Sequence, residues 1–181
     1  MSISAEDRAT LVSLARRAVE AQVRGQAPPK VEGPGELLRR KRGCFVTLTN
    51  GGRLRGCIGT FTPGRLLGEM VVEMGAAAAQ DPRFVFDRIT PTELGELSVE
   101  VSVLSPLEET AEPEKLEIGT HGIYIVGRSS GCFLPEVAVE MAWTAEEFLD
   151  HCCASKAGLP TRAWKEPGTK VYLFTTEKFD H

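Results

Sequence analysis

The residue of this sequence best suited to chemistry is Cys57, in the run Arg55-Gly56-Cys57-Ile58-Gly59-Thr60. On a predicted strand, Arg55 and Cys57 share a face with their Cα atoms about 6.6 Å apart. A guanidinium at that distance favours the thiolate form of a cysteine. Glycines before and after the thiol allow close approach by a ligand or by another backbone. The run is therefore compatible with a reactive thiol, although a small cysteine buried in the core is the plainer interpretation.

Four further polar residues could complete a site around this thiol. His121 lies in a Gly-Thr-His-Gly loop and could accept a proton from Cys57, although a solvent-exposed loop histidine is the plainer interpretation. Thr60 offers a hydroxyl. Asp81 can cap a turn before Pro82, which leaves Arg83 to bind an anion. We take Cys57 and His121 as candidate catalytic residues, and Arg55, Thr60, Asp81 and Arg83 as candidate substrate-binding residues.

Two other motifs are interpreted as structural. Gly127-Arg128-Ser129-Ser130-Gly131 matches the G-x-S-x-G of a nucleophile elbow, but that elbow needs a helix directly after it. Here Cys132-Phe133-Leu134 follows, which predicts a hairpin turn. His151-Cys152-Cys153 lies on a predicted helix, where successive side chains point about 100° apart and cannot hold one ion. We expect no metal site and no cofactor.

Composition limits the function classes further. The 181 residues include 21 Lys and Arg against 25 Asp and Glu, a net charge of −4, which argues against a dedicated nucleic-acid binder despite the basic run 39–42. No apolar stretch is long enough to span a membrane, and residues 1–6 do not resemble a signal peptide. Five cysteines without regular spacing indicate reduced thiols, so we expect a cytoplasmic protein. The length predicts one domain over residues 1–181.

The hydrophobic pattern predicts both helices and strands. Helical spacing covers 4–24 and 65–80, and Thr144 begins a third helix that ends before Gly158. Residues 106–117 are expected to form a loop or short helix. Strands are expected at 44–49, 53–58, 97–104, 123–126, 132–134 and 171–174. The strands follow one another as hairpins, which predicts an α+β fold with a mostly antiparallel sheet and packed helices.

The register of the first hairpin can be argued from its apolar pattern. A three-residue loop at 50–52 pairs Leu48 with Leu54 and Val46 with Gly56, so that Leu54 and Ile58 join the buried face. Cys44 and Cys57 then lie on opposite faces and cannot form a cross-strand disulfide.

Several of these motifs together resemble the AMMECR domain family, whose bacterial and archaeal members are called AmmeMemoRadiSam system protein A. The resemblance rests on Leu54-Arg55-Gly56-Cys57-Ile58-Gly59 and on Asp81-Pro82-Arg83-Phe84. Further matching segments lie at 43–48, 101–105, 121–122, 133–135 and 156–160, so the resemblance covers about residues 10–175. Glu136 departs from the Gln that many members carry.

The resemblance implies an α+β fold with a larger and a smaller lobe and a cleft between them. It also implies a Memo-like protein and a radical SAM enzyme as partners, since the prokaryotic genes of the family stand beside theirs. The biochemical activity of the family is not settled. Two hypotheses follow: a functional thiol at Cys57 in an unassigned pathway, or a non-catalytic adaptor that binds a protein partner or a small anion.

Overall fold

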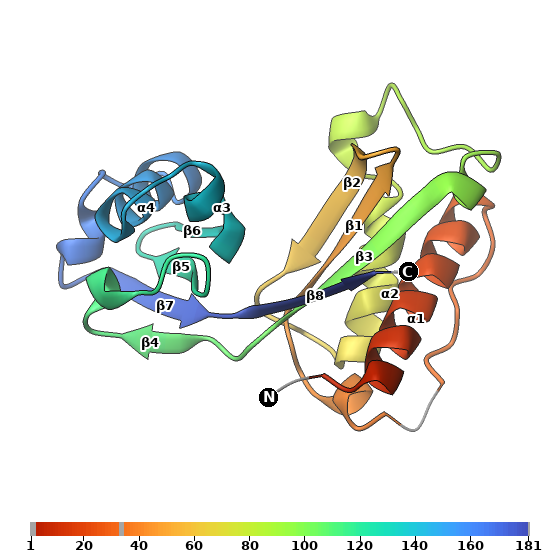
Figure 1. The fold of residues 1–181 in the computed structure, drawn as a ribbon, viewed down its shortest axis with the longest axis horizontal. Coiled ribbons are helices and arrows are strands. Elements are labelled where there is room, and N and C mark those ends of the chain that lie inside the picture. Colours follow the sequence, from red (N-terminus) through yellow and green to blue (C-terminus); the bar gives the residue numbers. More distant parts are fainter. Residues whose placement is uncertain (1–2, 33–34, 181) are drawn as a thin grey trace. The chain divides into compact units, whose positions relative to one another are not determined.

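The computed structural model describes residues 3–32 and 35–180, which form two compact units. Unit 1 comprises residues 1–104 and 177–181, and unit 2 comprises residues 105–176. Each unit contains a four-stranded sheet and its own helices, so the predicted α+β class is confirmed. Figure 1 shows the elements of both units.

Unit 1 is a sheet with two helices packed on one face. Strand order is β2-β1-β3-β8, with bounds Arg53–Thr60, Cys44–Asn50, Leu97–Leu104 and Thr176–Asp180. The helices α1 (Ala5–Val23) and α2 (Leu67–Ala78) run side by side behind it in the view of Figure 1. Short 3-10 helices are η1 (Leu37–Arg39), η2 (Pro82–Phe84) and η3 (Leu94–Glu96). The core between sheet and helices includes Leu11, Val46, Val71 and Val101, each at most 1% exposed.

Unit 2 is a smaller sheet with its own helices and a separate core. Strand order is β4-β7-β5-β6, with bounds Glu108–Thr110, Lys170–Phe174, Gly122–Val126 and Ser130–Phe133. The helical segments are η4 (Pro113–Lys115), α3 (Pro135–Glu140), α4 (Ala145–His151), the π-helical η5 (Cys152–Lys156) and η6 (Ala163–Lys165). Phe148, Ile123 and Ile125 are fully buried at its centre.

Most predicted elements are present. Ser4 caps α1 as expected, its Oγ accepting from the N–H of Asp7, and Thr144 opens α4 in a capping box with Glu147. The interpretation of residues 106–117 was incomplete, because the strand β4 lies within this segment. The strand β8 and the helix α3 lie in segments where the pattern predicted neither.

The predicted register of the first hairpin was wrong. Asn50 pairs with Arg53 around a two-residue turn, Gly51-Gly52, in which both glycines have positive φ. A β-bulge then shifts the pairing, so Leu48 faces Gly56 and Val46 faces Ile58. Leu54 is consequently 37% exposed and does not join the core. The expected separation of Cys44 and Cys57 is confirmed: Cys44 lies in the core, and Cys57 faces Thr47 on the other side of the sheet.

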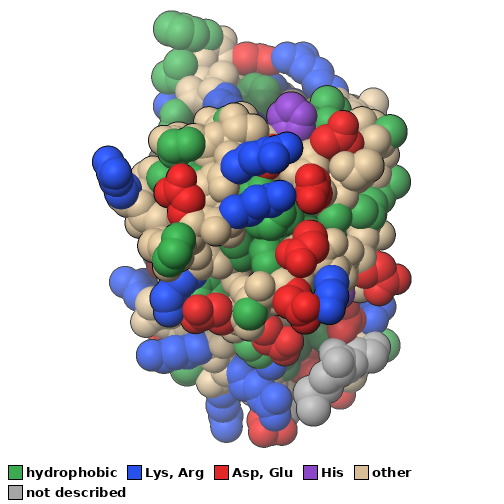
Figure 2. All heavy atoms as spheres, turned by 90° about the vertical axis from the view of Figure 1, so that its left-hand side faces the viewer, with side chains coloured by type: hydrophobic (Ala, Val, Ile, Leu, Met, Phe, Trp, Pro, Cys, Tyr) green, Lys and Arg blue, Asp and Glu red, His purple; other side chains and the backbone are tan. Residues whose placement is uncertain are grey.

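Two features bear on the classes of function that the composition argued against, namely membrane spanning and nucleic-acid binding. No helix among the described residues is long and apolar enough to cross a membrane. On the face drawn in Figure 2, basic and acidic side chains are interspersed, with no broad field of one sign. This face therefore lacks the basic stripe that is typical of nucleic-acid binding.

Gly56 is the tightest packing point of β2 and yields a first prediction. A Cβ built on Gly56 would overlap the backbone carbonyl of Ala78 at the end of α2. We expect Gly56→Ala to lower the free energy of unfolding by about 3 kcal/mol, because two backbones must separate. Urea denaturation measures the change. Gly64→Ala is the matched control, since no atom lies within 4 Å of its Cβ position, and an equal loss in both variants would contradict the prediction.

Candidate functional site

Arg55 lies at the bulge in β2, has no partner residue on β1, and is buried. Its side chain is 4% exposed and donates from Nε to Glu93 at 2.6 Å and from Nη2 to the other Glu93 oxygen at 3.1 Å. Nη1 donates to Asp87 at 2.9 Å. The hydrogen bond to Glu93 is the main reason that the pKa of Arg55 is raised, and the same contact lowers the pKa of Glu93. Arg55 therefore ties the segment between α2 and β3 to β2.

That segment places Asp81 and Arg83 directly beside Cys57. The N–H of Cys57 donates to Asp81 Oδ2 at 3.0 Å, and the carbonyl of Cys57 accepts from Arg83 Nη2 at 3.2 Å. Arg83 also donates from Nε and Nη2 to the Asp81 carboxylate, at 3.0 and 2.6 Å. Hydrogen bonds from the Arg83 side chain, and then from the backbone of Cys57 and Arg83, outweigh burial and lower the pKa of Asp81 to about 2.

The thiol of Cys57 is half-buried and has a hydroxyl neighbour. Thr47 Oγ1 lies 3.3 Å from Cys57 Sγ, directly across the β1–β2 pair. Arg83 is the exposed cation of the site, because 57% of its side chain is open to solvent while Arg55 is enclosed. The arrangement thus holds a reachable thiol beside a guanidinium whose Nη1 makes no hydrogen bond to any described residue.

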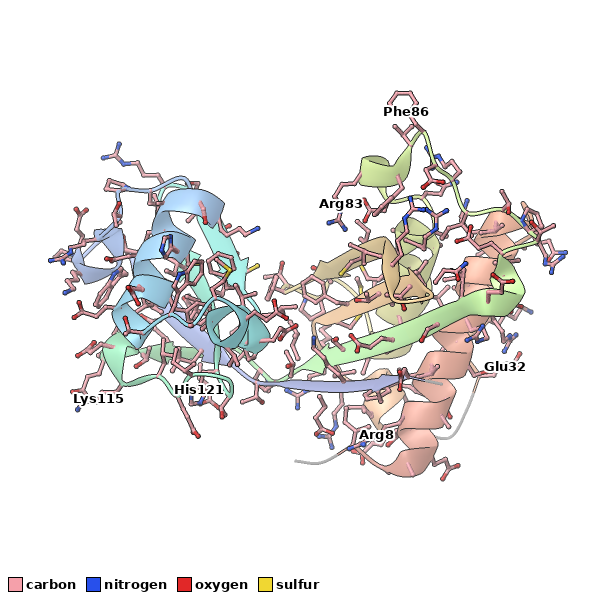
Figure 3. The ribbon with its side chains drawn as sticks, turned by 45° about the horizontal axis from the view of Figure 1, so that its top comes forward. Arg8, Glu32, Arg83, Phe86, Lys115 and His121 are labelled. Atoms are coloured by element: carbon pink, nitrogen blue, oxygen red, sulfur yellow. The ribbon has the colours of Figure 1, made fainter. Side chains whose placement is uncertain are left out.

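The remaining candidate residues, Thr60 and His121, make local contacts. Thr60 ends β2, and its hydroxyl donates to the carbonyl of Thr62 at 3.2 Å. His121 belongs to unit 2, on the loop leading into β5 (Figure 3). Its Nδ1 accepts from the N–H of Glu117 at 3.0 Å, which orients the ring locally. A pairing of His121 with Cys57 stays a prediction.

Burial favours the neutral thiol form of the other four cysteines. Burial raises the pKa of Cys44 to about 12 and that of Cys132 to about 11, and burial also raises the pKa of Cys152 and Cys153. A raised pKa leaves little thiolate near neutral pH.

The two motifs interpreted as structural have structural contacts. Ser129 lies in the turn between β5 and β6, and its hydroxyl donates to the carbonyl of Ala157. His151 is exposed and stacks on Trp143, whereas Cys152 and Cys153 are buried. Within the ranges the structure describes, no group of three or more His, Cys, Asp or Glu could hold a metal ion.

Sequence reasoning missed Glu93 and Asp87, which hold Arg55. They lie 38 and 32 residues from it, so no local spacing links them. The one available signal was Arg55 itself, because an arginine that is buried within a strand requires acceptors for its donors.

Comparison with known proteins places the chain among relatives of similar length. Residues 12–179 match the family model described as AMMECR1. A protein of Methanothermobacter thermautotrophicus is 39% identical over 98% of this chain and 95% of its own. Protein TK0174 of Thermococcus kodakarensis is 45% identical over 94% of this chain and 88% of its own.

A solved structure is similar over the whole fold. The crystal structure of the uncharacterized protein PH0010 from Pyrococcus horikoshii has a TM-score of 0.84 and 41% sequence identity to this chain. The match covers 99% of this chain and 93% of that one.

Removal of the Arg55 side chain should lower the free energy of unfolding far more than removal of the exposed Arg53 side chain. We expect Arg55→Ala to destabilise the fold by about 3 kcal/mol, because Glu93, with a side chain only 16% exposed, loses its partner. Arg53→Ala, whose side chain is 68% exposed, should cost less than about 1 kcal/mol. Chemical denaturation compares the two, with Arg55→Lys as an intermediate variant if Arg55→Ala does not fold. Equal effects would contradict the assignment.

Asp81 should make stability depend on pH in a defined window. Its pKa is lower in the folded chain, about 2, than the ordinary 3.8, so its contribution is full above about pH 5. The contribution is lost as the pH falls through 2. We expect Asp81→Asn to be less stable than the parent by about 1–2 kcal/mol at pH 7 and equally stable near pH 2. Thermal denaturation from pH 7 to 2 measures this, and a constant difference across the range would refute it.

Proposed function

Since this chain belongs to the AMMECR1 family, we propose that it acts in the cytoplasm with a Memo-like protein and a radical SAM enzyme, with Cys57 as its functional thiol. In this proposal Arg83 orients the substrate beside the thiol, and Asp81 fixes Arg83. Arg55 holds the segment that carries both residues. The partnership rests on the resemblance, and the role of Cys57 rests on the geometry of unit 1.

The observation that carries the proposal is the set of hydrogen bonds around one half-buried cysteine, Cys57. Backbone N–H and C=O of Cys57 are both bound by the Asp81–Arg83 pair, so the position of the thiol is fixed from two sides. The Thr47 hydroxyl lies within hydrogen-bond distance of the sulfur. A fixed thiol with a neighbouring hydroxyl and an exposed guanidinium is suited to covalent chemistry on a bound substrate.

The alternative is a non-catalytic adaptor that uses the same strand. The adaptor needs the backbone of β2 and the exposed Arg83, but it does not need a sulfur at position 57. The two functions therefore differ in whether the thiol itself is required.

The first test is the alkylation rate of each cysteine. At pH 7 we expect Cys57 to react with iodoacetamide at least about tenfold faster than Cys132, because both are half-buried but Cys132 has a pKa raised to about 11. Peptide mass spectrometry reads all five positions in one sample. Arg83→Gln should slow the reaction at Cys57 and leave Cys132 unchanged. Equal rates at Cys57 and Cys132 would count against the thiol function.

The second test separates the thiol from the adaptor. Cys57→Ser keeps the size of the side chain and can retain the contact to Thr47, so we expect a folded protein that still joins its partners. In the assembled system of Memo-like protein, radical SAM enzyme and this chain, the variant should lose activity if the sulfur reacts. Unchanged activity would leave the adaptor as the function.

A further inference from the structure

We infer that the free edge of β2 at Gly59 binds an extended peptide segment, which adds to the sheet of unit 1 as a short further strand. The inference rests on the proposed function in that it names the class of substrate or partner presented to Cys57. It depends on backbone geometry and not on the reactivity of the sulfur.

β2 is an edge strand of its sheet. The strand order is β2-β1-β3-β8, so among the described residues β2 pairs with β1 alone. In an antiparallel pair, the N–H and C=O of alternate residues point toward the neighbour or away from it. Both groups of Cys57 point away from β1, because they bind Asp81 and Arg83.

The same alternation directs the N–H and C=O of Gly59 outward. Gly59 lies two residues beyond Cys57 on the same strand, and its pairing with Phe45 continues the register of Cys57 with Thr47. No described residue forms a hydrogen bond with either group, and Gly59 is half-buried. One donor and one acceptor thus stand side by side at an open sheet edge, and such pairs are what a β-strand partner binds.

The Asp81–Arg83 pair shows which chemistry this edge accepts. At Cys57 a carboxylate oxygen accepts and a guanidinium donates, as the C=O and N–H of a neighbouring strand would. The pair closes the edge at Cys57 and leaves it open at Gly59. An incoming segment therefore has room for the pairing at Gly59 and must end or turn away before Cys57, which brings its nearest side chain toward the thiol.

Charge and apolar contacts favour a peptide over a free small anion. Asp81 already balances the charge of Arg83, so the free Nη1 of Arg83 suits a neutral carbonyl oxygen as well as an anion. A Cβ on Gly59 would overlap the half-buried ring of Phe45. Gly59 therefore keeps the Phe45 ring beside the open edge, where it fits an apolar side chain of the peptide.

The loop after η2 carries a separate, exposed aromatic ring. Phe86 is fully exposed, and Figure 3 shows its ring projecting away from the loop in a direction different from that of Arg83.

The test uses the full chain and synthetic peptides. Peptides are selected from a random twelve-residue display library, and the tightest is titrated into the ¹⁵N-labelled protein. We expect the amide exchange of Gly59 to slow at least about tenfold at saturation, because its N–H gains an acceptor. The amide of Gly64, in the loop beyond β2, serves as the internal control and should not change. Absence of any selected peptide, or protection that avoids Gly59, would overturn the inference.

A backbone scan of the peptide distinguishes strand addition from side-chain recognition. N-methylation of the residue whose N–H binds the Gly59 carbonyl should weaken affinity about tenfold, while methylation of its two neighbours should not. A flat profile would overturn strand addition. Arg83→Gln should also weaken binding, and Arg128→Gln, an exposed arginine of unit 2, is its matched control.

Cys57→Ala separates this inference from the thiol function. We expect the variant to bind the peptide with unchanged affinity, since no hydrogen bond of the docked strand involves sulfur. Peptide binding without selective alkylation of Cys57 would leave docking in place and remove the thiol function. Selective alkylation without peptide binding would do the reverse.

Discussion

The site of this protein depends on the ion pairs of one buried arginine at the bulge in β2. Arg55 is buried there, and a buried arginine is costly unless both its charge and its donors are satisfied. Glu93 and Asp87 satisfy them and thereby fasten the chain between α2 and β3 onto the sheet. Asp81 and Arg83 lie on that fastened segment, so their contact with Cys57 follows from a charge pairing that is remote from the thiol.

The motif around Cys57 divides its tasks among neighbouring residues. Arg55 binds Glu93, Gly56 leaves room for the end of α2, and Gly59 leaves room for the ring of Phe45. The side chain of Cys57 is left facing Thr47 on the side of the sheet away from the core. At Gly56 and at Gly59, another part of the chain occupies the space that a Cβ would fill. Much of the sequence motif therefore reflects close packing around Cys57.

Periodicity predicted the α+β class, the cap of α1, the main helices and the opposite faces of Cys44 and Cys57. It could not predict the register of the hairpin, because a bulge is one extra residue and leaves the alternation on each side intact. The strand β8 escaped because Thr176–Asp180 alternates weakly and is placed by a strand more than seventy residues earlier in the chain. In the site, Cys57, Asp81 and Arg83 were found from residue types and turn chemistry. Glu93 and Asp87 were not, since only the fold brings them to Arg55.

The connection between β3 and β8 has a consequence for how the chain folds. These strands are neighbours in unit 1, yet the whole of unit 2 lies between them in sequence. At the junction, the N–H of Ser105 donates to Thr175 and the N–H of Thr175 donates to the Ser105 hydroxyl, so the two ends of unit 2 are clasped where a hairpin turn would stand. Unit 2 is thus an insertion within a hairpin. During synthesis, β1, β2 and β3 leave the ribosome before all of unit 2, and β8 is synthesised only after it. The long connection between β3 and β8 nevertheless costs little stability, because the entropy of closing a loop grows only slowly with its length.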